Sequence, residues 1–149
     1  MAAGLSLRSD NLAAFRVRLN DLARSALKSD ALVAELRLDA EVGLEEITLN
    51  CLTALDRLRP TGQGNPSIHF FARNLTHQRP LQRLGNDRQH VKMWVTDGNI
   101  MHEAVWWKAG EESLPVGRFD IAFAPQINEY NGHRRVQLKV LDWRAAGAL

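Results

Sequence analysis

Basic and histidine side chains are concentrated in one stretch of this sequence. Between His69 and Lys92, five basic residues stand against a single acidic one, and three histidines are interleaved with them. Positive charge at this density favours an anionic partner, most economically nucleic acid. A solvated surface with no partner can carry the same local excess, so both interpretations stay open. The candidate nucleic-acid-binding residues of the stretch are Arg73, Arg79, Arg83, Arg88, His90 and Lys92.

Aromatic side chains could supply the second half of such a site. Proteins that bind single strands combine a basic groove with aromatic rings on which bases stack. Trp94 shares one side of its predicted strand with His90 and Lys92, which favours a solvent-facing, stacking position. Trp106 and Trp107 are neighbours, so one of them at most faces the core. For Trp143 we favour a place in the core.

A further group of candidate binding residues lies in "NEYNGHRR", residues 128–135. Asn131-Gly132 is a two-residue hairpin signal. The turn would present Tyr130, His133, Arg134 and Arg135 near its tip. Either the segment is a tight turn with a charged tip, or it is a loop that closes over a nucleic-acid strand. The sequence does not separate these two interpretations.

Arrangements typical of an enzyme are missing from the sequence. The five histidines stand singly, without an HxH, HExxH or DHH triplet, and His102 and Glu103 would point to opposite faces of a strand. There is no GxSxG motif and no P-loop. Cys51 is the only cysteine, which excludes a cysteine metal site and fits a reducing, cytosolic compartment. We therefore expect no catalytic residue, metal or cofactor in this chain.

The glycine-rich segment "RPTGQGNP", residues 59–66, could either cradle a phosphate or turn the chain. It follows a predicted helix rather than a strand and is not GxGxxG, so a dinucleotide site is excluded. Pro60 would end the helix, Gly62 and Gly64 allow positive φ, and Asn65-Pro66 favours an extended chain. We predict a domain-junction turn at Gly62, Gly64, Asn65 and Pro66. A phosphate contact from its amides stays open.

The segments before this turn predict a mixed α/β fragment. Residues 2–7 resemble the tail of a strand, and residues 35–42 alternate as a short strand would. A helix capped by Ser9 or Asp10 should end near Lys28, and a second helix should span residues 44–58. The first helix carries an apolar stripe of Leu12, Phe15, Leu19, Leu22, Ala23 and Ala26.

The segments after the turn predict strands. From residue 67 onward, short runs rich in β-branched and aromatic residues are separated by Gly, Asn, Asp and Pro. Asp97-Gly98 and Asn131-Gly132 are both hairpin signals. Five or six strands with no helix among them predict a small antiparallel sandwich or barrel, and an OB-type barrel fits roughly 80 residues best. The predicted fold class is therefore α+β, with a short N-terminal strand and helix, a connecting helix and an antiparallel OB-type β-barrel.

The overall composition is that of an ordinary globular protein. The 149 residues are 45% apolar and 24% charged. Residues 1–59 carry 8 basic and 9 acidic side chains, whereas residues 60–149 carry 11 and 8, so the positive charge belongs to the strand-rich part. No apolar run approaches the roughly 20 residues of a membrane span, and no signal peptide is visible. We expect a cytoplasmic protein with no membrane partner.

Three blocks follow one another along the sequence: "LxxLxPxGxGNP…F" in residues 55–71, "R…G…HVKM" in residues 83–93, and "NEYNG…VQLKVLDW" in residues 128–143. In this order they resemble the C-terminal region of the RecJ single-stranded-DNA-specific exonucleases. The first residues, "MAAGLSLRSDNLAAF", resemble the DHHA1 motif GGH-x-x-AAG without its Gly-Gly-His. The match covers almost the whole chain, and the GNP and NEYNG blocks are its most specific parts.

The resemblance implies a domain organisation. Residues 1–42 would be the end of a DHHA1 domain, residues 43–66 a connecting helix with the GNP turn, and residues 67–145 an OB-fold domain. In this family, Asp and His residues of a DHH domain hold Mn²⁺ or Mg²⁺, and this chain contains none of that domain. We expect the chain to be a C-terminal fragment, or the product of a gene start at an internal methionine, without nuclease activity of its own.

The resemblance also implies a function and partners. The chain would bind single-stranded DNA for a 5′→3′ single-strand-specific exonuclease of DNA repair and recombination. The alternative is a structural or protein-interaction module that braces the nuclease or docks a repair partner. Expected partners are single-stranded DNA, the missing DHH and DHHA1 domains, and a single-strand-binding protein. Loss of the rest of DHHA1 would expose the stripe of the first helix, so we also expect self-association.

Overall fold

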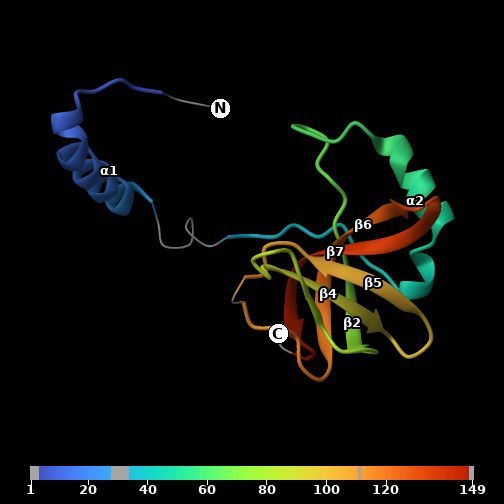
Figure 1. The fold of residues 1–149 in the computed structure, drawn as a ribbon. Helices are drawn as coiled ribbons and strands as arrows, with labels where there is room; N and C mark the ends of the chain where they lie inside the picture. Colours follow the sequence, from blue (N-terminus) through green and yellow to red (C-terminus); the bar gives the residue numbers. More distant parts are fainter. Residues whose placement is uncertain (1–3, 28–33, 111, 148–149) are drawn as a thin grey trace. The chain divides into compact units, whose positions relative to one another are not determined.

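The structure is a computed structural model that describes residues 4–27, 34–110 and 112–147. Its internal contacts divide the chain into two units, Met1–Leu36 and Arg37–Leu149 (Figure 1). Among the described residues, the first unit contains one α-helix, and the strands all lie in the second unit.

The helix of the first unit is α1, Leu12–Ala26, preceded by a 3₁₀ turn at Ser9–Asn11. The predicted helix is thus confirmed, but the predicted cap at Ser9 or Asp10 is wrong, because the N-cap residue of α1 is Asn11, which makes no side-chain capping bond. Lys28, the predicted end of the helix, lies outside the described residues. None of the residues of α1 is buried, so no other side chains in the described part of this unit pack over its apolar stripe. Leu12, Leu19 and Leu22 have 50%, 51% and 63% of their surface exposed.

The prediction of two short strands in the N-terminal third is wrong for most of the residues concerned. Residues 4–7 form no strand, since no neighbouring strand in the described residues pairs with them, and residues 2 and 3 lie outside that description. The segment 35–42 contributes only β1, Ala40–Glu41, which pairs in parallel with the start of β2, Phe70–His77. An alternating pattern makes a strand only where a partner supplies hydrogen bonds.

The predicted helix over residues 44–58 is broken into three pieces. A 3₁₀ turn at Leu44–Glu46 is followed by α2, Leu49–Leu55, and by a second 3₁₀ turn at Asp56–Leu58. Thr48 is extended and starts a new helix, because its Oγ1 accepts a hydrogen bond from the Cys51 amide at 3.1 Å. The apolar side chains of Leu44 and Ile47 are nevertheless buried.

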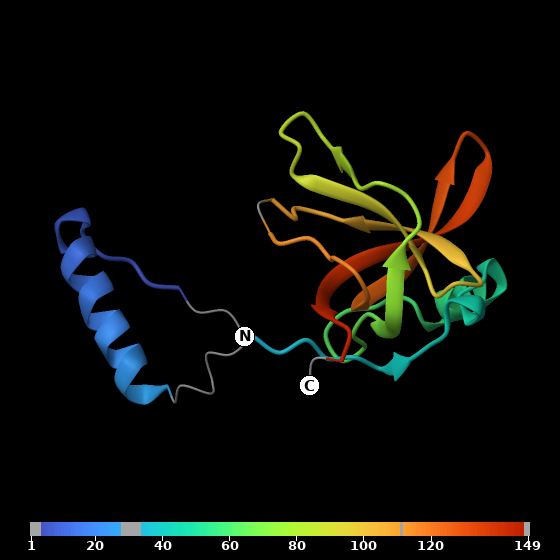
Figure 2. The ribbon, with the colours of Figure 1, turned by 90° about the horizontal axis from the view of Figure 1, so that it is seen from below.

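Six strands follow the junction turn, and five of them form a closed ring. The sheet order is β1-β2-β6-β7-β5-β4-β3, and an additional pairing of β2 with β4 joins its ends, so the ring runs β2-β4-β5-β7-β6. In Figures 1 and 2 these strands wrap around a shared interior, and the β6–β7 hairpin projects beyond it. After β2, the strands are β3 Gln82–Leu84, β4 His90–Thr96, β5 Met101–Trp106, β6 Phe119–Tyr130 and β7 His133–Ala145.

The strand directions correct one part of the prediction. Four pairs of the ring are antiparallel, but β5 and β7 are parallel. The chain leaves β5, passes through β6 on the far side of β7, and returns along β7, so β7 runs in the direction of β5. This arrangement is OB-like, and the expected α+β class with an OB-type domain is confirmed.

The two hairpin signals have different outcomes. Asn131-Gly132 forms the predicted two-residue turn, with Tyr130 opposite His133 and positive φ of 50° and 74° at the turn residues. Asp97-Gly98 does not form one, because Thr96 is opposite Met101 and four residues separate them. The Asp97 carboxylate accepts hydrogen bonds from the amides of Asn99 and Ile100, both at 2.9 Å, and these bonds hold the longer loop.

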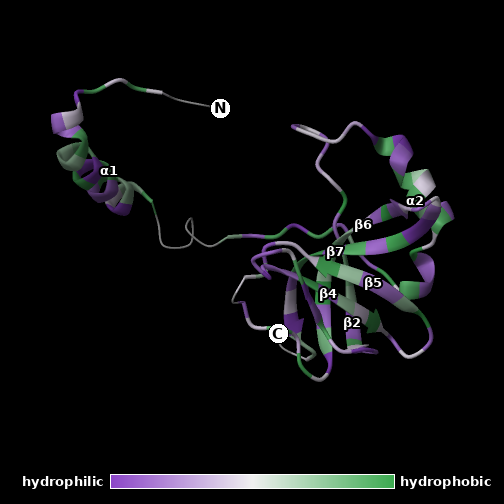
Figure 3. Ribbon diagram, viewed as in Figure 1, coloured by the Kyte–Doolittle hydropathy of each residue, from purple (hydrophilic) through white to green (hydrophobic). Residues whose placement is uncertain are grey.

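The core lies inside the ring. The predicted alternation of β4 is confirmed, since Val91, Met93 and Val95 are fully buried. Figure 3 shows hydrophobic and hydrophilic residues alternating along the strands. Trp106 and Trp143 pack against the core, and the Trp143 ring nitrogen donates to the Ser113 carbonyl at 2.9 Å. The largest buried core residues are Phe119, Phe123, Leu44, Ile47, Leu75, Met93, Ile121 and Leu138.

Candidate nucleic-acid interface

A row of hydrogen-bonded polar side chains crosses the outer face of four strands. Lys92 of β4 forms an ion pair with Glu103 of β5. Glu103 accepts a hydrogen bond from Gln137 of β7, and Gln137 accepts one from Gln126 of β6, each at 2.6 Å. The strand register places Glu103 beside Gln137 and Gln137 beside Gln126, so the row follows from the pairing of the sheet. We call Lys92, Glu103, Gln137 and Gln126 the polar row.

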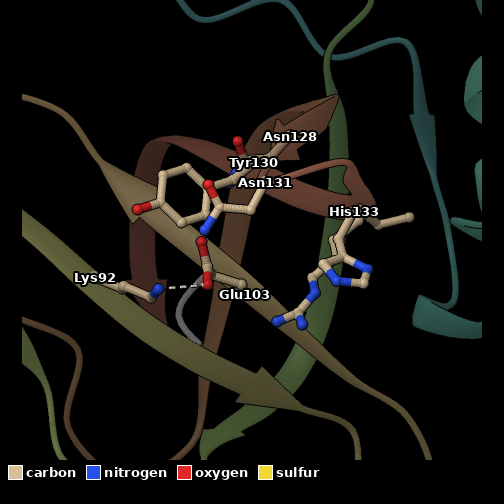
Figure 4. A pocket seen from close by; sticks show the side chains of 8 residues that line it. Lys92, Glu103, Asn128, Tyr130, Asn131 and His133 are labelled. Carbon is tan, nitrogen blue, oxygen red and sulfur yellow. Dashed lines mark ion pairs between the residues drawn. The ribbon is translucent and has the colours of Figure 1, made fainter.

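A groove of about 400 Å³ lies between part of the polar row and the β6–β7 hairpin. In Figure 4 a dashed line joins Lys92 to Glu103, with Tyr130 and Asn131 above Glu103 and His133 to its right. The groove is mixed in character, with amide, phenol and cationic groups around one carboxylate. Its lining residues are Lys92, Glu103, Asn128, Tyr130, Asn131, His133, Arg135 and Val136.

Three of the predicted site residues come together in this groove. Lys92 lies on β4, Tyr130 at the end of β6, and Arg135 near the start of β7. Tyr130 has 73% of its surface exposed, so its ring is accessible to a ligand. The closed ring and the long β6–β7 hairpin therefore place Lys92 close to Tyr130 and Arg135, although these residues are far apart in the sequence.

Two further predicted residues form a cluster with Lys92. Trp94 lies opposite Glu103 in the β4–β5 register, next to the groove. The Lys92 ammonium is 4.9 Å from the centre of the Trp94 ring, and the Arg79 guanidinium is 5.3 Å from it. Both cations are attracted to the electron-rich ring face, so Arg79 covers part of the surface on which a base would stack.

Three other predicted binding residues have structural partners elsewhere. Arg73 pairs with Glu41 of β1 at 3.1 Å. Arg83 donates to the Gly110 carbonyl at 2.6 Å, which ties β3 to the loop after β5. His90 accepts a hydrogen bond from the Lys108 amide through Nδ1 at 3.0 Å. These contacts give the three side chains roles in the fold.

Arg88 and Arg134 also lie apart from the groove. Arg88 occupies a turn, with φ of 55° and its amide donating to the Gly85 carbonyl at 3.1 Å. Arg134 is opposite Glu129 in the hairpin register, and it precedes Arg135, which lines the groove. Neighbouring residues of a strand point to opposite faces, so Arg134 belongs to the other face of the hairpin.

The glycine-rich segment forms a self-contained turn. The amides of Gly62 and Asn65 each donate to the other's carbonyl, at 2.7 and 3.1 Å. The Asn65 side chain donates to the carbonyls of Leu58 and Pro60, at 2.8 and 3.0 Å. Gly64 adopts the predicted positive φ, 87°, whereas Gly62 does not. The two bonded amides serve the turn itself, and Pro66 follows it toward β2.

Titratable groups outside the groove show no metal-site geometry. Within residues 4–27, 34–110 and 112–147, no three His, Cys, Asp or Glu side chains are grouped as a cation site requires. Hydrogen bonds from the amides of Ile100 and Asn99 hold the pKa of Asp97 below its usual value, and this carboxylate serves the β4–β5 loop. None of the helices in the described part of the chain is long and apolar enough to cross a bilayer.

Sequence reasoning missed the acceptor and amide groups of the interface. Glu103 was considered only as a metal ligand beside His102, and Gln126, Asn128 and Gln137 were not considered. Alternation along β5 could have placed Glu103 on the face of Trp94. The contact of Glu103 with Gln137 depends on the parallel β5–β7 register, which joins residues far apart in the sequence.

A five-membered strand ring of this order, with one parallel pair, has the topology of OB-fold proteins, and it carries a polar groove beside its last hairpin. Within this class, residues 38–142 match the RecJ OB domain. The chain belongs to the RecJ OB domain family, and the resemblance to RecJ is confirmed.

Similar proteins cover nearly all of the chain. It is 28% identical over 145 residues to the single-stranded-DNA-specific exonuclease RecJ of Bacillus subtilis, which corresponds to 95% of this chain and 18% of that protein. It is 32% identical to RecJ of Dickeya dadantii, over 94% of this chain and 24% of that protein. The chain thus spans a quarter or less of the length of these two relatives.

A solved structure supports the fold. The crystal structure of RecJ from Thermus thermophilus in complex with Mn²⁺ matches 98% of this chain and 21% of its own, with a TM-score of 0.68 and 24% identity. At this level of identity the likeness concerns the fold, which agrees with the OB-like ring.

Proposed function

We propose that this chain is the single-stranded-DNA-binding module of a RecJ-like 5′→3′ exonuclease that acts in DNA repair and recombination. The nuclease reaction, with its Mn²⁺ or Mg²⁺, would belong to a DHH domain elsewhere in the longer protein. The chain by itself would bind DNA without cleaving it. Residues 1–42, 43–66 and 67–145 would be the end of DHHA1, the connection and the OB domain.

The position of the groove carries this proposal. OB folds bind oligonucleotides on the face of their second and third strands and in the loops that join the first to the second and the fourth to the fifth. In this ring those parts are β4, β5, the segment with Arg79 and the hairpin with Tyr130. The Arg79–Trp94–Lys92 cluster and the groove occupy the same parts.

The side chains at the groove suggest how a strand would be held. The exposed Tyr130 ring offers a stacking surface for a base, and Arg135 offers a guanidinium for a phosphate. Trp94 could accept a second base if Arg79 moves from its ring to a phosphate. Bases and phosphates would then be bound by different residues along the same path.

Fluorescence polarisation with a labelled dT oligonucleotide tests the proposal on the full chain. We expect the logarithm of the affinity to fall linearly with the logarithm of salt concentration, by about 0.7 for each phosphate neutralised. A duplex of equal length should bind more weakly, and Arg73→Ala, outside the groove, should change neither quantity. Binding that ignores salt and both Tyr130→Ala and Arg135→Ala would contradict the proposal. Mn²⁺-dependent nucleotide release by the pure chain would contradict the absence of nuclease activity.

A second function, the docking of a protein, is favoured by the exposed apolar stripe of α1. In the longer protein the OB domain would brace the DHH and DHHA1 domains or receive a single-strand-binding protein, and the stripe of α1, at the end of DHHA1, would be covered by the rest of that domain. Capture of purified single-strand-binding protein after nuclease treatment would support docking. Loss of capture in that treatment would show that DNA bridges the two proteins.

A further inference from the structure

We infer that the groove holds a subsite for the edge of a nucleobase with an exocyclic amino group, and that Glu103 is the residue that recognises it. The inference rests on the proposed function and adds a base preference to it. Its basis is the polar row, which fixes one carboxylate on the floor of a groove otherwise suited to DNA.

The polar row points its donors at Glu103. The Gln126 amide donates to Gln137, the Gln137 amide donates to Glu103, and the Lys92 ammonium pairs with Glu103 from the other side. Glu103 is therefore the final acceptor of a chain that spans four strands. Its side chain is 21% exposed and that of Lys92 is 24% exposed, so the pair is held in place while still reachable from the groove.

This arrangement disfavours a phosphate on the floor of the groove. A phosphate that approached Lys92 would meet the Glu103 carboxylate at close range, and like charges repel strongly where solvent is partly excluded. Lys92 is already neutralised by its partner. Arg135 also lines the groove and is the better position for the backbone of a bound strand.

The same arrangement favours an amino group. An ionised carboxylate only accepts hydrogen bonds and has about four acceptor positions, of which Gln137 and Lys92 fill two. Cytosine presents an N4 amino group, adenine an N6 and guanine an N2, and glutamate to cytosine N4 is a recurring contact. Thymine has no amino group: its one donor, the N3–H, lies between two carbonyl oxygens, which the carboxylate would repel on either side, so thymine should bind more weakly here than cytosine.

The groove has room and a stacking surface for one base. Its volume of about 400 Å³ lies within the range of about 300–1,000 Å³ typical of small-ligand sites. Tyr130, 73% exposed, lines the same groove as Glu103 (Figure 4). A base stacked on this ring could direct its edge to the carboxylate.

The test compares labelled dC and dT oligonucleotides of equal length on the full chain, at neutral pH, by fluorescence polarisation. We expect dC to bind roughly tenfold more tightly, the discrimination of one good base contact. Glu103→Gln keeps the shape and removes the charge, and should bring the ratio of the two affinities to about twofold or less. Glu129→Gln removes the same charge from the strand position preceding Tyr130, outside the groove lining, and should preserve the ratio.

The outcomes separate this inference from the proposed function. Equal binding of dC and dT by the unmodified chain, or a ratio that survives Glu103→Gln, would overturn the inference and leave DNA binding intact. A uniform gain for both oligonucleotides in Glu103→Gln would show that the carboxylate only screens Lys92, which also overturns it. No binding to either oligonucleotide would overturn the proposed function, and the inference with it.

Discussion

Tyr130 and Trp94 flank the polar row, and their surroundings give them different parts in binding. Trp94 lies under two cations, whereas Tyr130 lies at the tip of a hairpin with most of its surface exposed. A base can reach Tyr130 without displacing a protein contact that holds the fold. We therefore expect Tyr130 to dominate stacking.

Tyr130→Ala should weaken oligo-dT binding by about 1–3 kcal/mol, the worth of one stacked base. Tyr130→Phe keeps the ring and should bind nearly as well as the unmodified chain. Fluorescence polarisation measures both, and thermal melting should show no change for either, because the side chain is exposed. An equal loss in Tyr130→Phe would mean that the hydroxyl group, rather than stacking, carries the contact.

Two of the predicted arginines differ in their contacts: Arg135 lines the groove, whereas Arg83 is bonded to the backbone. Arg135→Ala should make the salt dependence of oligo-dT binding shallower by about 0.7, with an unchanged melting temperature. Arg83→Ala should lower the melting temperature and leave the salt slope unchanged, since Arg83 binds the Gly110 carbonyl. A shallower slope in Arg83→Ala would place that residue on the DNA path.

Single residues differ in how well the sequence predicts them. The outward position of Lys92 and Trp94 follows from alternation along one strand, which needs only near neighbours. The structural roles of Arg83 and His90 depend on carbonyl and amide groups at Gly110 and Lys108, which only the folded chain brings near. The residue types of Arg83 and His90 suggest binding to an anion, but they do not reveal the backbone groups with which these side chains form hydrogen bonds.

At the scale of elements, the β4–β5 loop depends on one carboxylate. Asp97 accepts two amide hydrogen bonds in the loop, and these bonds hold its pKa below the usual 3.8. A carboxylate with a lowered pKa in the folded state stabilises the fold above its unfolded pKa. That contribution is lost as pH falls through the lower folded value.

Asp97→Ala should therefore reduce the free energy of unfolding by about 1 kcal/mol at neutral pH. The difference from the unmodified chain should shrink as pH falls below 3.8. Urea unfolding at a series of pH values measures both quantities. A difference that stays constant into the acid range would mean that the ionised carboxylate does not hold the loop.

Elements built from local signals were predicted better than those that depend on distant partners. Asn131-Gly132 forms its hairpin because the turn chemistry lies within two residues. The segment 44–58 has one continuous apolar period, yet Thr48 interrupts the helix while Leu44 and Ile47 stay buried. The apolar period predicted a helix there but could not reveal the break in the backbone at Thr48.

At the scale of the whole molecule, the strand pattern predicts an OB-type barrel but does not show which strand pairings close it. The β2–β4 pairing and the parallel β5–β7 pairing join segments far apart in the chain, and no hairpin signal marks them. The count of strands and the apolar interior were predictable, because both follow from alternation within each strand.

The exposed stripe of α1 makes the oligomeric state testable. We expect the chain to self-associate, and Leu19→Glu with Leu22→Glu to shift it toward monomer, because charges oppose burial of that face. Val17→Glu is a matched control, since Val17 is 61% exposed on the same helix but outside the stripe. Light scattering over a concentration series measures the mass. A monomer at all concentrations, or an equal effect of Val17→Glu, would contradict the expectation.

The place of β7 in the ring has a consequence for how the protein is made. β7 pairs with both β6 and β5, and its Leu138 and Val140 fill the core between them. A nascent chain that has not yet released β7 from the ribosome can form the β4–β5 hairpin but cannot close the ring. Completion of the fold must therefore wait for the end of translation of this region, and until then the apolar faces of β4 and β6 are open to chaperones.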